Sequence, residues 1–217
     1  MNTITTGRMG VLVLLIVALT GCSTAYYKTM EAFGKEKRDL LRSNVEAARE
    51  EQVEAQEEFK DALTQLKELT QFEGGELEDT YNELKDQYED CEDRAEAVRG
   101  RIEKVDQIAA DLFAEWEKEI AQISNDKMKQ DSAKKRKATQ QRYATLHTAL
   151  QSSEKKMDAV LVRFRDNVLY LKHNLNAQAV GTLDTEVVSI EKDVAALIKD
   201  MEASIAKADD FIATLPE

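Results

Sequence analysis

A series of apolar residues between positions 77 and 116 constrains the fold more than any other feature of this sequence. The spacing between successive members alternates between four and three residues without interruption, for more than five heptads. Such a repeat is typical of helices that pack as coiled coils or bundles. After the last member the spacing slips by one residue, to Ile120 and Ile123, so we expect the supercoil to relax there. The series consists of Leu77, Tyr81, Leu84, Tyr88, Cys91, Ala95, Val98, Ile102, Val105, Ala109, Leu112 and Trp116.

Three other stretches carry apolar series, of which the first has the same alternating spacing and the other two follow it with interruptions. Gln52 is the only polar member of the first, and we interpret it as a residue that sets helix register or is partly solvated, rather than as a functional group. The fourth stretch has a wider apolar face, which suits a bundle better than a two-helix coil. The first comprises Leu41, Val45, Ala48, Gln52, Ala55, Phe59, Ala62, Leu66 and Leu69; the third Tyr143, Leu146, Leu150, Met157, Val160, Phe164, Val168, Leu171 and Leu175; the fourth Leu183, Val187, Ile190, Val194, Leu197, Met201, Ile205, Ala208 and Ile212.

Few residues interrupt these patterns. Gly74-Gly75 and Gly181-Thr182 are predicted breaks, because glycine ends helices readily, and residues 124–126 form a weaker one. The predicted helices are 28–73, 76–123, 132–178 and 184–214. Their short connections force antiparallel neighbours, and a single proline argues against an all-β fold. We therefore predict an all-α fold, in which residues 22–217 form one elongated antiparallel bundle of long coiled-coil-like helices.

The N-terminal residues are interpreted as an export signal. Arg8 precedes an apolar segment at 11–18 that is short for a membrane-spanning helix. The following Leu-Thr-Gly-Cys resembles the lipobox of bacterial lipoproteins, which predicts a cleaved signal peptide at 1–21 and lipidation of Cys22. The residue after the cysteine is Ser23 rather than aspartate, which by resemblance to the sorting rules of enteric lipoproteins favours the outer membrane. We expect a lipid-anchored protein on the inner leaflet of the outer membrane, facing the periplasm.

Charge and motifs exclude several kinds of function. The net charge of −12 disfavours nucleic-acid partners. The sequence lacks a phosphate-binding loop, a nucleophile elbow and a paired-histidine zinc motif. Neither His147 nor His173 has a second histidine at metal-ligand spacing, so we expect no metal. Because the catalytic and phosphate-binding motifs are absent, we expect no cofactor and no enzymatic activity. Cys91 is interpreted as a buried hydrophobic residue, with an intermolecular disulfide as the alternative.

Basic residues cluster in one segment of this acidic chain. Only Asp126 and Asp131 oppose them. Because the first two predicted helices are antiparallel, this segment is expected at the same end of the bundle as the start of the first helix. Contact with an anionic leaflet or an anionic envelope polymer is therefore one interpretation, and a solvated loop is the other. The cluster comprises Lys127, Lys129, Lys134, Lys135, Arg136, Lys137 and Arg142.

Five segments resemble the bacterial family known as domain of unknown function 2959. They are KRDLLRSNVEAAREEQVEAQEEFKDAL (37–63), GGELEDTYNELKDQYEDCEDRAEAVRGRI (74–102), ADLFAEW (110–116), FRDNVLYLKHNLNA (164–177) and VAALIKDMEASIAKADDFI (194–212). The resemblance implies lipoprotein signals and long helices, and no established activity. Within the fourth segment, Lys172, His173, Asn174 and Asn176 form either a polar recognition patch or a fraying helix end.

These observations favour a non-enzymatic envelope lipoprotein that acts as a periplasmic spacer, scaffold or adaptor for a protein partner. The alternative is a regulator of a cell-wall enzyme that acts through the distal helical tip. A hidden enzyme site is a third, less favoured interpretation. The sequence leaves the oligomeric state open.

Overall fold

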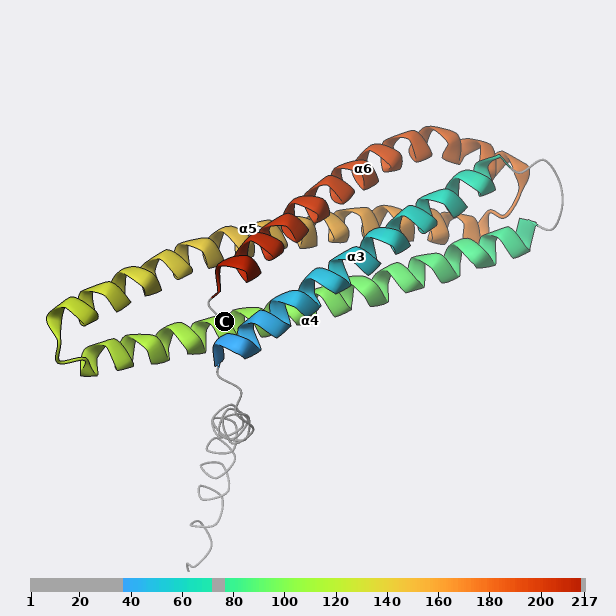
Figure 1. Ribbon diagram of the computed structural model, residues 1–217. Coiled ribbons are helices and arrows are strands. Elements are labelled where there is room, and N and C mark those ends of the chain that lie inside the picture. The colour runs from blue at the N-terminus through green and yellow to red at the C-terminus, as the bar shows by residue number, and fades with distance from the viewer. Residues whose placement is uncertain (1–36, 72–76, 216–217) are drawn as a thin grey trace, which may run out of the picture. The chain divides into compact units, whose positions relative to one another are not determined.

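The described residues are entirely helical or in short turns. A computed structural model describes residues 37–71 and 77–215. Within them are α3 (Lys37–Thr70), α4 (Leu77–Gln122), α5 (Asp126–His173) and α6 (Ala177–Thr214), and no strand (Figure 1). The all-α prediction is confirmed. The predicted signal peptide, Cys22, the predicted helical residues 28–36 and Gly74-Gly75 lie outside the described residues.

The chain divides into two compact units, residues 1–40 and 41–217. The packing described below is that of the second unit. In it, side-chain contacts between α3 and α6 show that these helices run antiparallel. Near the start of α3, Arg49 lies 2.6 Å from Asp209, close to the end of α6. Near the end of α3, Lys67 lies 2.6 Å from Glu191, in the first half of α6.

Helices α4 and α5 are also antiparallel neighbours. The guanidinium of Arg99 donates a 2.8 Å hydrogen bond to Asp158. Closer to the connecting turn, Arg136 donates a 3.0 Å hydrogen bond to the carbonyl of Phe113. The predicted antiparallel bundle of long helices is therefore confirmed (Figure 1).

The heptad seams form most of the core, and the corrections lie toward the ends of the seams. Phe113 is buried, whereas the predicted seam members Leu112 and Trp116 are only half-buried. On α6, Ser204 and Phe211 are buried, whereas the predicted Ile205 and Ile212 are only half-buried. Four predicted members at the ends of other seams are also half-buried: Leu77, Tyr81, Tyr143 and Leu175. Helix ends contact fewer neighbours, so spacing alone misplaces these positions.

The break between α5 and α6 lies at residues 174–176, not at Gly181. Asn174 is the C-cap of α5, and its backbone N–H donates to the carbonyl of Leu171. The carbonyl of Asn176 accepts from Val180 in the first turn of α6. Gly181 is helical and exposed. The predicted break at Gly181-Thr182 and the predicted helix start at 184 are wrong, because burial of the neighbouring apolar residues outweighs the helix cost of one glycine, about 1 kcal/mol.

Helix α5 starts six residues before the predicted position 132. Asn125 is its N-cap, and the side-chain oxygen of Asn125 accepts a 3.1 Å hydrogen bond from the backbone of Met128. This cap satisfies an end group that would otherwise lack a partner, so the polar residues up to Ser132 remain helical. The predicted break at residues 124–126 is thus real but shorter than expected.

Helices α4 and α5 continue beyond the level at which α6 ends (Figure 1). Near the end of α6, the ring centroid of Phe211 lies 5.9 Å from that of Tyr143 on α5. We call residues 114–142 the α4–α5 extension. At 1.5 Å per residue it is roughly 20 Å long. No residue of the extension is fully buried.

Candidate functional site

The predicted basic cluster lies on the α5 arm of the α4–α5 extension. Two of its members hold the two arms together. Lys129 donates to the carbonyl of Ala121 in the last turn of α4, at 3.3 Å. Arg136 donates to the carbonyl of Phe113 and, also at 3.0 Å, to the carboxylate of Glu117. These two cations therefore have a structural role.

The other cations of the cluster point into solvent. Lys135 forms an exposed pair with Asp131 at 2.9 Å, and its hydrogen bond lowers the pKa of the Asp131 carboxyl. Within the described part of the chain, Lys127, Lys134 and Lys137 form no ion pair, and all three are exposed. The structure thus separates structural cations from cations that are available to a partner.

Apolar side chains accompany these cations on the extension. The indole N–H of Trp116 donates a 2.9 Å hydrogen bond to the hydroxyl of Ser132, which ties α4 to α5. Ile120 follows on the same stripe of α4, Ile123 lies in the turn just after this helix, and both remain half-buried. Met128, in the first turn of α5, is 63% exposed. Sequence reasoning had not connected these residues with the basic cluster.

The predicted recognition patch occupies the opposite end of the bundle. Lys172 and His173 are exposed in the last turn of α5, where positive charge is favourable beside the helix carboxyl end. The side chain of Asn174 donates a 2.9 Å hydrogen bond to the carbonyl of Tyr170. Asn174 and Asn176 therefore have capping roles, and all four residues remain exposed.

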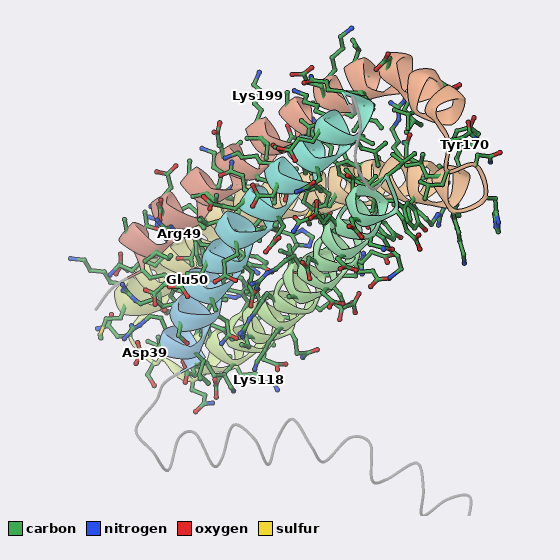
Figure 2. The ribbon with its side chains drawn as sticks, turned by 90° about the vertical axis from the view of Figure 1, so that its right-hand side faces the viewer. Asp39, Arg49, Glu50, Lys118, Tyr170 and Lys199 are labelled. Atoms are coloured by element: carbon green, nitrogen blue, oxygen red, sulfur yellow. The ribbon has the colours of Figure 1, made fainter. Side chains whose placement is uncertain are left out.

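An exposed apolar pair adjoins this patch and was missed by the sequence analysis. Leu169 is 50% exposed and Tyr170 is 39% exposed. Figure 2 shows Tyr170 at this end of α5, whereas Lys118 lies on the extension. Apolar residues that fall off a heptad seam were the available signal. Exposed apolar residues rimmed by polar ones are typical of protein-binding surfaces.

A buried polar layer connects three helices in the middle of the bundle. The amide of Gln52 donates a 2.8 Å hydrogen bond to the hydroxyl of Ser153 on α5. The amide oxygen of Gln52 accepts a 2.8 Å hydrogen bond from Ser204 on α6. All three side chains are fully buried. The prediction that Gln52 sets register is consistent with this layer, and Ser153 fills the position that the third apolar seam skips.

A second polar cluster closes the core where the four helices become two. The hydroxyl of Tyr143 donates to one carboxylate oxygen of Asp106, and Nε2 of His147 lies 3.0 Å from the other. The ring of Tyr143 contacts Phe113 and Phe211, each with centroids 5.9 Å apart. Burial, and then the hydrogen bond to Asp106, raise the pKa of the Tyr143 phenol. The cluster holds α4 against α5.

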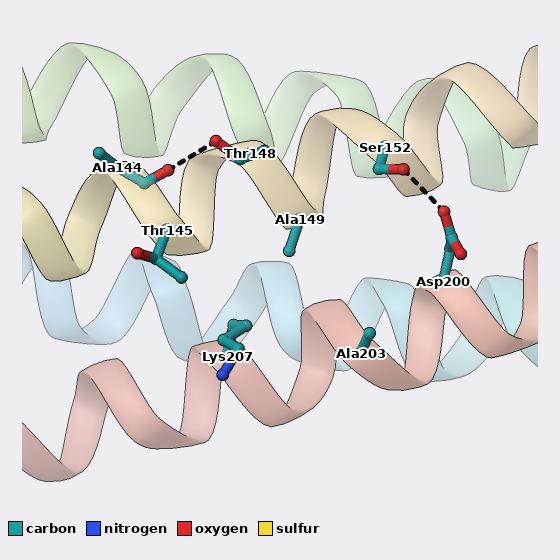
Figure 3. A pocket seen from close by; sticks show the side chains of 8 residues that line it. All are labelled: Ala144, Thr145, Thr148, Ala149, Ser152, Asp200, Ala203 and Lys207. Carbon is teal, nitrogen blue, oxygen red and sulfur yellow. Dashed lines mark hydrogen bonds between the residues drawn. The ribbon is translucent and has the colours of Figure 1, made fainter.

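A shallow groove lies between α5 and α6 (Figure 3). Its volume is about 590 Å³. The hydroxyl of Ser152 donates a 2.7 Å hydrogen bond to Asp200 across the groove. Lys156, and then Ser152, lower the pKa of the Asp200 carboxyl by hydrogen bonding. The polar groups of the groove thus have hydrogen-bond or ion-pair partners within the protein. The lining residues are Ala144, Thr145, Thr148, Ala149, Ser152, Asp200, Ala203 and Lys207.

The remaining candidate residues have structural surroundings. Cys91 is a buried free thiol, and burial, followed by the charges of Glu58 and Asp90, raises its pKa.

Among the described residues no group of three or more histidine, cysteine or acidic side chains is arranged to hold a metal ion. Nor does any described helix combine the length and apolar character that a membrane crossing requires.

The comparisons with known proteins yield one match. The profile of the family described as "Protein of unknown function (DUF2959)" matches residues 26–215. No curated protein and no solved structure matches the chain.

Proposed function

Since the chain belongs to the DUF2959 family of proteins of unknown function, we propose a role from its own residues: a non-enzymatic lipoprotein that works as a scaffold or adaptor in the cell envelope. The lipid would be carried by Cys22, in the outer membrane on its periplasmic side. The Leu-Thr-Gly-Cys segment that follows the apolar residues 11–18 supports the anchor.

The observation that carries the adaptor role is the exposed apolar pair Leu169 and Tyr170. It adjoins four exposed polar residues at the end of the bundle opposite the α4–α5 extension. An aromatic and an aliphatic side chain beside flexible polar groups can bury apolar area and also donate hydrogen bonds to a protein partner. The polar residues are Lys172, His173, Asn174 and Asn176.

Photo-cross-linking in the native bacterium tests the adaptor role. A photoreactive amino acid would replace Leu169 or Tyr170, and the matched control would replace Val53, an exposed apolar residue on α3 that is 37% exposed. We expect one recurrent protein partner from the first two positions and none from Val53. Capture of a cell-wall enzyme, with a change in its activity when His173 and Asn176 are replaced by alanine, would favour the regulator. Equal cross-linking from all three positions would refute the adaptor role.

The anchor has its own test. Cells fed an alkyne analogue of palmitate should label the wild-type chain and not a Cys22→Ala variant. A wild-type chain that stays unlabelled, with residues 1–21 still attached by mass spectrometry, would refute the lipoprotein assignment and leave the partner test unaffected.

A further inference from the structure

The α4–α5 extension carries an apolar stripe that its two arms leave half-exposed. From the buried Phe113 the stripe continues through Trp116 and Ile120 on α4 to Ile123 in the turn that follows, in steps of three and four residues. In the bundle the equivalent positions, such as Val98, Val105 and Ala109, are buried. Because α6 ends near the level of Tyr143, the stripe becomes half-exposed beyond that level. At the tip, Met128 adds a side chain that is 63% exposed.

The charge of the extension is opposite to that of the chain. The chain has 30 basic and 42 acidic residues, whereas residues 114–142 contain eight basic and five acidic ones. The remainder of the molecule is therefore more acidic than the chain as a whole. The acidic residues of the extension are Glu115, Glu117, Glu119, Asp126 and Asp131; its basic residues are those of the predicted cluster and Lys118.

The exposed lysines lie close enough to the end of the α4–α5 extension, which we call the tip, to reach the charges of a membrane surface. From Met128 to Lys137 the helix rises by about 14 Å at 1.5 Å per residue. A headgroup layer is roughly 6 Å thick on each side of a bilayer, and charges act over about 8–10 Å at physiological ionic strength. A tip that enters the headgroup layer at Met128 therefore brings the exposed lysines within range of anionic headgroups.

We infer that the tip of the α4–α5 extension binds the surface of an anionic phospholipid bilayer. Ile123 and Met128 enter the headgroup layer. The four exposed lysines, Lys127, Lys134, Lys135 and Lys137, face the anionic headgroups. The same surface repels the acidic remainder of the bundle, which orients the bundle away from the membrane. The inference deepens the proposed scaffold function, on which it rests, because it gives that scaffold a defined orientation.

Tryptophan fluorescence tests the contact in the full chain. Trp116 is the only tryptophan, so a Trp116→Phe, Met128→Trp chain has one reporter, placed at the tip. The chain is reconstituted with phosphatidylcholine vesicles, with or without phosphatidylglycerol, whose acyl chains are brominated near the headgroup. We expect strong quenching with phosphatidylglycerol, weak quenching without it, and relief by high salt because ions screen the attraction.

Charge variants separate the tip from the rest of the surface. The substitutions K127Q, K134Q, K135Q and K137Q together should abolish most of the quenching. The matched control, K60Q, K155Q, K192Q and K199Q, removes the same charge from exposed lysines of the bundle and should leave quenching unchanged. Circular dichroism verifies that both chains remain helical.

Three results would overturn the inference: equal quenching in both vesicle types, full quenching in the tip variant, or cross-links between copies at Met128 without lipid contact. Mass spectrometry of the same samples reports the lipid on Cys22 independently. A missing lipid together with normal quenching would thus refute the anchor and not the tip contact.

Discussion

Gln52 and Ser153 form a fully buried hydrogen bond of 2.8 Å between α3 and α5. The two positions are 101 residues apart in the sequence. The bond places one polar layer at a fixed height in an otherwise apolar core. A slip of either helix by one heptad would bury these groups without partners, which costs roughly 1–3 kcal/mol for each group. The layer therefore specifies register.

The first prediction concerns this layer. Gln52→Ala should lower the free energy of unfolding by about 1–3 kcal/mol, because it removes the partner of Ser153 and Ser204 and leaves a cavity. Urea denaturation measures the change. A Gln52→Leu chain that also carries Ser153→Ala and Ser204→Ala should recover most of the loss, since no unpaired group remains. If Gln52→Ala unfolds at the wild-type urea concentration, the layer has no part in stability.

Gly181 provides the second prediction. It lies inside α6, and a Cβ atom placed there meets nothing within 4 Å. Gly181→Ala should raise the free energy of unfolding by about 0.5–1 kcal/mol, because alanine has less conformational freedom to lose in a helix. Gly100→Ala, in α4 with equally open space, should give a similar gain. Thermal unfolding would show lower midpoints instead if residue 181 were a helix break.

The third prediction is a pH dependence at alkaline pH. The pKa of Tyr143 is raised above its ordinary value of 10 by burial and by the hydrogen bond to Asp106. A raised folded-state pKa contributes stability that is present below pH 10 and is lost as the pH rises above it. Tyr143→Phe should cost about 1 kcal/mol near pH 7 by loss of one hydrogen bond.

Denaturation of both chains from pH 8 to pH 11 measures this effect. The stability difference between wild type and Tyr143→Phe should shrink as the pH rises through 10, because only the wild type has a phenol to ionise at this position. A difference that stays constant over this range would show that Tyr143 ionises equally easily in the folded and unfolded chains.

The fourth prediction concerns the thiol of Cys91. Burial raises its pKa, and the thiolate is the reactive form. The folded chain at pH 8 should therefore resist alkylation by iodoacetamide at this residue, and urea should expose it. Peptide mass spectrometry measures the extent of alkylation at Cys91 separately from that at Cys22. Rapid modification in the folded chain, or a disulfide-linked dimer through Cys91, would favour the alternative interpretation of this residue.

Local chemistry explains which helix boundaries were predictable. The turn between α4 and α5 was predicted because the polar residues 124–126 interrupt the apolar pattern, although the start of α5 was placed six residues too late because the Asn125 cap was not recognised. The turn between α5 and α6 was misplaced because Gly181 is the stronger local signal. A glycine in a helix is tolerated when its neighbours are buried, as Val180 and Leu183 are. That burial is not a local property.

The candidate sites were predictable to a smaller extent. The basic cluster was evident from composition, but its division into structural and exposed cations was not, since it depends on where the carbonyls of Phe113 and Ala121 lie. The contact between Tyr143 and Asp106 joins residues 37 positions apart, which spacing within one helix does not relate.

The sequence by itself determined the fold class, the antiparallel order of long helices and most of the core. Heptad spacing is a repeated local property, and a repeated apolar stripe has to be buried. Only the tertiary structure decided that Ser153 and Ser204 meet Gln52, and that the apolar stripe of α4 continues past the end of α6, where it is only half-buried. These features depend on how far each helix extends relative to its neighbours, and that follows from the packing of all four helices together.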